Sequence, residues 1–247
     1  MDLPEEDRLE LLVALARRSW SAEETAAAAA DDDVANQGKV YDHSFQEFAA
    51  VDRALPPEKG GILFVGSSIF SHWKTVGEQM APLPVLNRAF GGSRTADQLA
   101  LFDQLIPVYA PKIVVYYCGS NDLKAAIMPE DPPSIFARFR AFAEKVQATQ
   151  PGTRLVYVSA TRSPDRVARW EQVDHYNALV RAYCTATPHH TFIDSNPAFV
   201  DTDGHPRLEL YVADKLHFKP AAYVLFTALI KPVLTRLWAE CTVKAAE

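Results

Sequence analysis

The sequence of 247 residues has few cysteines, no cluster of basic residues and no long apolar run. Its three cysteines, Cys118, Cys184 and Cys241, lie far apart without a Cys-x-x-Cys pair, which argues against a zinc or redox centre. The formal net charge of −6 and the scattered basic residues argue against a nucleic-acid-binding surface. No apolar stretch approaches the ~20 residues that a membrane-spanning helix needs, so we expect no membrane span.

The N-terminal residues, Met1 to Asp7, are acidic and lack the apolar core of a signal peptide. A soluble, cytoplasmic protein is therefore expected. Residues 8–30 show the spacing of two helices, and Asn36-Gln37-Gly38 has the composition of a linker. We predict a helical N-terminal extension over residues 1–36 and one α/β domain over residues 37–247. The extension is the candidate surface for a protein partner or a second copy of the chain.

Short apolar strands alternate with amphipathic helices along the rest of the chain. Strands are expected at residues 62–65, 84–87, 112–118, 154–159 and 191–194, and helices at 44–55, 95–106, 134–149, 170–184 and 220–238. This alternation predicts an α/β fold in which a parallel sheet has helices on both faces. Right-handed crossovers then bring the carboxyl ends of all strands to one edge of the sheet.

Polar and small residues follow three of these strands, and more lie in the loop before the last helix. Ser68 follows the first strand, Gly91-Gly92 the second and Asn121 the third, while Asp214 and His217 lie in the loop. Ligands of open α/β sheets bind beyond the carboxyl ends of the strands. The topology therefore gathers a hydroxyl, small-residue amides, a side-chain amide, an imidazole and a carboxylate, which together can perform acyl transfer.

The residue types suggest a role for each group. A serine hydroxyl such as that of Ser68 attacks a carbonyl carbon only when a base removes its proton, and the imidazole of His217 suits that role. Asp214, three residues earlier, can accept the imidazole Nδ1–H and fix its tautomer. The oxyanion hole would consist of the backbone N–H groups of Ser68 and Gly92 and the side-chain amide of Asn121.

These four blocks resemble those of the SGNH (GDSL-type) hydrolases, which are named for Ser, Gly, Asn and His in that order. The matching segments, within residues 44–238, are Gly66-Ser67-Ser68-Ile69, Asn87-Arg-Ala-Phe-Gly-Gly92, Gly119-Ser-Asn-Asp122 and Asp214-Lys-Leu-His217. The resemblance implies a flavodoxin-like, three-layer α/β/α fold with a five-stranded parallel sheet. It also implies cleavage of acyl esters without a metal or other cofactor. The first two blocks look closest to the branch near platelet-activating-factor acetylhydrolase-like and small-ester hydrolases.

Two features of the sequence leave alternatives open. Ser67 stands where the first block usually carries Asp, so either hydroxyl of the Ser67-Ser68 pair could be the nucleophile, with Ser68 favoured by its place in the motif. The same site could transfer the acyl group to an alcohol other than water, or the domain could be a catalytically silent binding module. The expected substrate is a small ester, with a short acyl chain because no long apolar lid insertion is present.

Overall fold

Five short strands form one parallel sheet within residues 34–124 and 130–243, the part of the chain that this computed structural model describes. In chain order they are β1 (Ile62–Gly66), β2 (Val85–Asn87), β3 (Ile113–Tyr117), β4 (Arg154–Val158) and β5 (His190–Ile193). The order across the sheet is β2-β1-β3-β4-β5, so β1 lies between β2 and β3. Phe64 of β1 is paired with Asn87 on one side and with Val115 on the other. The predicted five-stranded parallel sheet is confirmed.

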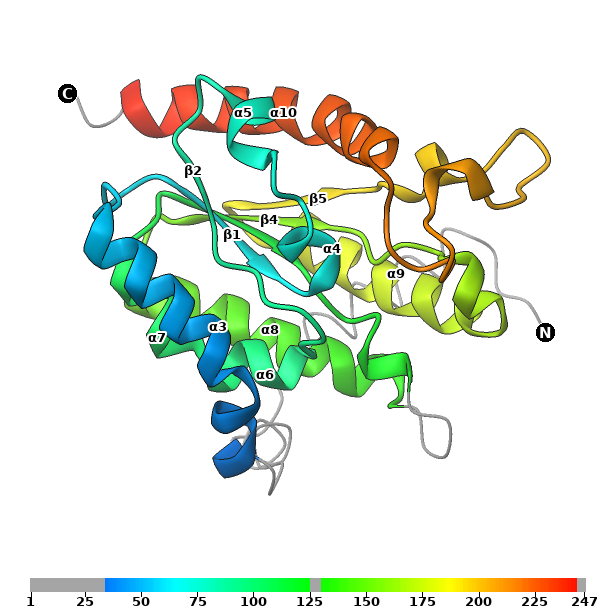
Figure 1. Ribbon diagram of the computed structural model, residues 1–247, viewed down its shortest axis with the longest axis horizontal. Helices are drawn as coiled ribbons and strands as arrows, with labels where there is room; N and C mark the ends of the chain where they lie inside the picture. Colours follow the sequence, from blue (N-terminus) through cyan, green and yellow to red (C-terminus); the bar gives the residue numbers. More distant parts are fainter. Residues whose placement is uncertain (1–33, 125–129, 244–247) are drawn as a thin grey trace.

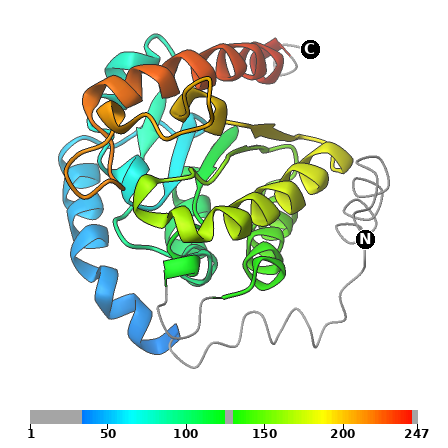
Figure 2. The same ribbon diagram turned by 90° about the vertical axis from the view of Figure 1, so that its right-hand side faces the viewer.

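Helices cover both faces of the sheet, as Figures 1 and 2 show. One face carries α3 (Val34–Ala54), α6 (Thr95–Ala100), α7 (Phe102–Tyr109), α8 (Pro132–Thr149) and α9 (Trp170–Ala186). The other carries α4 (Ser68–Ser71), α5 (Val76–Met80) and α10 (Pro220–Val243). The three-layer α/β/α architecture is therefore as expected.

The strands are apolar throughout because both of their faces are buried. All five residues of β1 and all five of β3 are buried. Successive side chains of a strand point to opposite faces. Leu63 and Val65 accordingly join the core under α7 and α8, and Ile62 and Phe64 join the core under α10.

Two predictions for this region are wrong: the linker at residues 36–38 and the start of a helix at residue 44. Asn36-Gln37-Gly38 and Ser44 all lie inside α3, which is one helix. Two contacts attach α3 to the body: Asp52 is paired with the buried Arg88, and the Tyr41 hydroxyl donates to Asp97 Oδ2 over 3.0 Å. Residues 1–33 lie outside the described part, so the predicted helices at 8–30 are not tested and the N-terminal extension remains a prediction.

The helix predicted over residues 95–106 is two helices. Leu101 has φ −94° and ψ 10° between α6 and α7, and the second helix continues to Tyr109. Leu101, at this interruption, and Phe102, directly after it, are both buried.

The last helix is longer than predicted. Within the described residues, Pro220–Thr242 is long and apolar enough to cross a membrane by length and composition, contrary to the expectation that no stretch approaches that size. A stripe of its buried side chains recurs every three or four residues and packs in the core against the sheet; it consists of Ala222, Phe226, Ile230, Leu234 and Leu237, with the buried Tyr223 beside it. Such a stripe is typical of a helix that covers a sheet.

Candidate active site

Three polar segments from distant parts of the chain meet at the carboxyl edge of the sheet. Ser68 is the first residue of α4, directly after β1, and Asn121 lies four residues beyond the end of β3. The loop before α10, drawn in orange in Figure 2, brings His217 to Ser68 although the two are 149 residues apart. The sequence therefore predicted correctly which segments meet.

Ser68, His217 and Asp214 form a connected chain of hydrogen bonds. His217 Nε2 lies 2.9 Å from Ser68 Oγ, and His217 Nδ1 lies 2.6 Å from Asp214 Oδ2. The other carboxylate oxygen, Asp214 Oδ1, accepts the backbone N–H groups of Leu216 and His217, both over 2.9 Å. Asp214 thus holds the turn with one oxygen and faces the imidazole with the other. The hydrogen bond from His217 lowers the pKa of the Asp214 carboxyl to about 2, so it is ionised at neutral pH.

The two adjacent serines have different surroundings. Ser67 is only 2% exposed, and its backbone N–H donates to Tyr117 O over 3.0 Å, which continues the pairing of β1 with β3. Ser68 is partly exposed, and its hydroxyl is the one that lies against His217. Ser68 therefore has both the accessibility and the base that a nucleophile needs.

A second imidazole lies beside His217. The ring of His72, just after α4, is 4.7 Å from the ring of His217 between centroids. Burial, and then the neighbouring His217, lower the pKa of His72 below its ordinary value. His72 is therefore neutral at neutral pH and adds no positive charge beside His217. The sequence gave no signal for this contact, because His72 belongs to none of the four blocks.

The glycine loop after β2 is tied to the end of β1. Gly92 has a φ of +80°, and no atom lies within 4 Å of the position that a Cβ would occupy there. The next residue, Ser93, is fully buried, and its hydroxyl donates to Gly66 O and Phe90 O. Gln98 Nε2 also donates to Gly66 O, over 3.3 Å. The loop thus presents the backbone at Gly92 to open space, and buried hydrogen bonds attach the loop to the end of β1.

The Asn121 side chain is held at both ends of its amide. Its Nδ2 donates to Ser93 O over 3.1 Å, which joins the second block to the third. Its Oδ1 accepts from Arg166 Nη2 over 3.2 Å. An amide NH₂ group has two N–H donors, so one remains for another acceptor after the bond to Ser93. Arg166 thus contacts a residue of the third block although it lies in none of the four blocks itself.

Asp122 is a buried carboxylate that orders the loop carrying Asn121. It is 1% exposed and accepts from the backbone N–H of Thr95 over 3.0 Å and from the Thr95 hydroxyl over 2.5 Å. Arg138 of α8 lies 3.4 Å from the same carboxylate. Burial is the main influence on this group and raises the pKa of its carboxyl above the ordinary value. Asp122 therefore connects the turn that carries Asn121 to the start of α6 and to α8. Its side chain contacts Thr95 and Arg138, and not His217.

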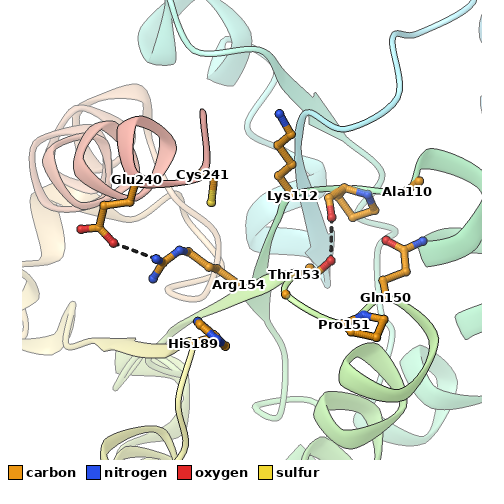
Figure 3. Close-up of a pocket in the computed structure, with 11 residues that line it drawn as sticks. Ala110, Lys112, Gln150, Pro151, Thr153, Arg154, His189, Glu240 and Cys241 are labelled. Carbon is orange, nitrogen blue, oxygen red and sulfur yellow. Dashed lines mark hydrogen bonds and ion pairs between the residues drawn. The ribbon is translucent and has the colours of Figure 1, made fainter. Parts of the chain in front are cut away.

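Two other features do not belong to this site. A cavity of about 620 Å³ is lined by Lys112, Arg154 and His189 (Figure 3), which stand at the amino ends of β3, β4 and β5. It thus lies at the opposite edge of the sheet from Ser68. Within the described residues, the exposed side chains of Asp201, Asp203 and His205 are close enough to share a metal ion. Asp201 Oδ1 already accepts two backbone N–H groups of its own turn, and exposed groups of this kind are common without an ion.

Comparison with known families agrees with the geometry. A sequence model of the GDSL-like lipase/acylhydrolase family matches residues 65–225, more than half of the chain and a span that contains all four blocks. The chain belongs to this family. It is therefore a hydrolase of carboxylic esters, as its blocks predicted.

The relatives of this GDSL-like hydrolase include named enzymes. The alpha1 subunit of human platelet-activating factor acetylhydrolase IB is 28% identical over 202 residues, which cover 78% of this chain and 82% of that protein. A GDSL-like lipase from Bacteroides thetaiotaomicron has a similar fold, with a TM-score of 0.64 and 19% identity over 78% of this chain and 97% of that one. An acetylxylan esterase from Geobacillus stearothermophilus gives a TM-score of 0.57 at 15% identity, over 73% and 95% of the two chains.

Proposed function

We propose that this hydrolase cleaves short-chain acyl esters, acetyl esters above all, with Ser68 as nucleophile, His217 as general base and Asp214 as the residue that orients the imidazole. One observation carries the proposal: a single imidazole lies 2.9 Å from a partly exposed hydroxyl on one side and 2.6 Å from an ionised carboxylate on the other. That arrangement is the one that activates a serine for acyl transfer.

In the first half of the reaction, Ser68 Oγ attacks the ester carbonyl carbon while its proton moves to His217 Nε2. The carbonyl oxygen becomes an oxyanion, for which the donors are the N–H groups of Ser68 and Gly92 and the second Nδ2–H of Asn121. One such donor is typically worth about 10²–10³ in rate. The tetrahedral intermediate then expels the alcohol, which takes the proton from His217 and leaves an acyl-Ser68.

In the second half, a water molecule gives a proton to His217 and attacks the acyl carbon. The same donors hold the new oxyanion, and Ser68 leaves as the protonated hydroxyl together with the carboxylic acid. Throughout, the Asp214 carboxylate stays ionised and accepts the Nδ1–H of His217, which stabilises the imidazolium that forms in each half.

The names of two similar proteins support the preference for short acyl chains. The platelet-activating factor acetylhydrolase subunit and the acetylxylan esterase are both named for removing acetyl groups. The expectation from the sequence is the same, because no long apolar insertion is present that could cover an extended acyl chain.

Hydrolysis of p-nitrophenyl esters tests the proposal. We expect p-nitrophenyl acetate to be cleaved, with rates that fall from acetate to octanoate, and Ser68→Ala to lower the rate by at least ~10³-fold. Ser67→Ala is the matched control, since it removes the neighbouring hydroxyl, and it should retain activity. A wild-type rate no higher than that of Ser68→Ala would refute the esterase proposal. Loss of activity in Ser67→Ala alone would move the nucleophile to Ser67, and a maximum at octanoate would refute the short-chain preference.

A further inference from the structure

We propose that Arg166 is a positioning residue of the oxyanion hole, which fixes the orientation of the Asn121 side-chain amide and polarises it toward the substrate. The inference rests on the proposed function, because it assigns to Asn121 a donor role in that reaction. Arg166 lies in η2 (Pro164–Arg169), a 3₁₀ segment after β4 that none of the four blocks includes.

The contacts of Arg166 determine which way the amide of Asn121 faces. The guanidinium can only donate, and its Nη2 lies 3.2 Å from one end of the Asn121 amide. The carbonyl oxygen of Ser93 can only accept, and it lies 3.1 Å from the other end. The oxygen of the amide must therefore face Arg166 and its nitrogen must face Ser93. Without Arg166, a reversed Asn121 amide would give up only the hydrogen bond to Ser93 O, and its NH₂ group could turn away from the substrate.

The same guanidinium polarises the peptide next to Asn121. Arg166 Nη1 donates to Ser120 O over 2.5 Å, and this carbonyl belongs to the Ser120–Asn121 peptide bond. Charge-assisted hydrogen bonds are the strong ones, and bonds in a chain polarise one another. A cation bound to Asn121 Oδ1 draws electron density from the amide, which makes its remaining N–H a better donor to a developing negative charge.

Within the described residues, the guanidinium of Arg166 has no carboxylate at hydrogen-bond distance. The residue is 7% exposed, and the carboxylate that pairs with it, Asp165 Oδ2, is 3.7 Å away, beyond hydrogen-bond distance. Burial lowers the pKa of the guanidinium below its ordinary value, although that value is so high that the group stays charged at neutral pH. The buried guanidinium at the oxygen end of the Asn121 amide can therefore balance the negative charge of an oxyanion bound at the nitrogen end.

The segment that carries Arg166 also contacts the turn of the triad. The backbone N–H of Asp165 donates to Lys215 O over 3.1 Å, and Lys215 lies between Asp214 and His217. Two neighbouring residues of η2 thus reach Asn121 on one side and the histidine turn on the other. We infer that η2 fixes the position of the oxyanion donor Asn121 relative to the base His217.

A double-mutant cycle tests whether Arg166 acts through Asn121. In Arg166→Met, which keeps a long side chain without charge or donors, we expect kcat for p-nitrophenyl acetate to fall about 10–100-fold while KM stays within about threefold, because the donor acts on the transition state. In an Asn121→Ala background the same substitution should cost less than about threefold. Arg162→Met is the matched control, because Arg162 lies on the same loop but pairs with Asp174. The kcat of this variant should equal that of the wild type.

A second measurement does not depend on activity. The Asn121 side-chain NH₂ resonances, identified in ¹⁵N spectra by their loss in Asn121→Ala, should shift in Arg166→Met and stay in place in Arg162→Met. Unshifted resonances, or an equal loss of kcat with and without Asn121, overturn the inference. If wild-type activity equals that of Ser68→Ala while the resonances still shift, the proposed function fails and the contact of Arg166 with Asn121 stands.

Discussion

Gly66 is the residue at which β1 ends and the chain turns toward Ser68, and we expect Gly66→Ala to destabilise the protein severely. Gly66 has a φ of +137°, and a Cβ built there would lie 2.0 Å from Tyr117 O, where real contacts stay beyond 3.0 Å. The clash is with backbone, so β1 and β3 must separate by about 1 Å or Gly66 must change its φ and ψ. A residue forced into such a sparsely populated region costs on the order of 1–3 kcal/mol. The adjacent hydrogen bond from Ser67 N to Tyr117 O contributes about 1 kcal/mol more.

With loosened packing added, we expect a loss of at least ~3 kcal/mol of unfolding free energy, or about 6–12 °C in Tm for a domain of this size. A shift of about 1 Å would also move Ser68 away from His217, and misplacement on that scale can cost about 10²-fold in rate. Denaturant unfolding followed by circular dichroism measures the first effect, and p-nitrophenyl acetate turnover the second. Gly77→Ala is the control: Gly77 is exposed in α5 with nothing within 4 Å, so alanine should be neutral or stabilise by about 0.5–1 kcal/mol. A Gly66→Ala protein within 1 kcal/mol of wild type would refute this reasoning.

Two further predictions concern the triad and the N-terminus. Asp214→Asn should lower kcat by about 10²–10⁴-fold, because the amide no longer fixes the productive tautomer of His217. The pKa of Asp214 is about 2, below its ordinary 3.8, so the stability that its ionisation contributes is complete above pH 4 and is lost as pH falls through 2. The acid limb of the wild-type profile of log kcat/KM against pH should therefore have a slope of one above pH 3, as for a single titrating group. A slope of two in that range would contradict the assignment. Removal of residues 1–55, which deletes α3, should abolish activity and the cooperative unfolding transition, because α3 packs on the body; a truncated protein with the kcat and Tm of the full chain would contradict that role for α3.

The catalytic segments could be predicted because each lies within a few residues of a strong local pattern. Ser68 follows an apolar strand of five buried residues, and Asn121 follows a second strand whose five residues are all buried. A parallel sheet with right-handed crossovers has only one carboxyl edge, so the positions of the strands alone bring these residues together. His217 follows no predicted strand directly, and its place at this edge was predicted because it lies in the loop before the last helix, which the topology brings to the same edge.

The supporting contacts could not be predicted because they join polar side chains that no periodicity relates. Arg166 was one of many arginines in loops until the structure buried it against Asn121. The hydroxyl of Ser93 and the amide of Gln98 both meet Gly66 O, a backbone atom that carries no sequence signal. Local composition also failed at Gly38, where a residue that disfavours helices lies inside α3, because tertiary contacts of α3 outweigh a propensity cost of about 1 kcal/mol.

The position of the oxyanion loop depends on a part of the chain that the family match leaves out. The matched residues are 65–225, yet α3 lies before them and packs against the glycine loop: the rings of Tyr41 and Phe45 contact Phe90, which directly precedes Gly91-Gly92. The Tyr41 hydroxyl donates to Asp97, and this carboxylate in turn accepts the backbone N–H of Arg94 over 2.7 Å. Both ends of the loop are thereby fixed from α3. An oxyanion donor works only when its position is set before the reaction, so under the proposed function α3 belongs to the structure that positions Gly92.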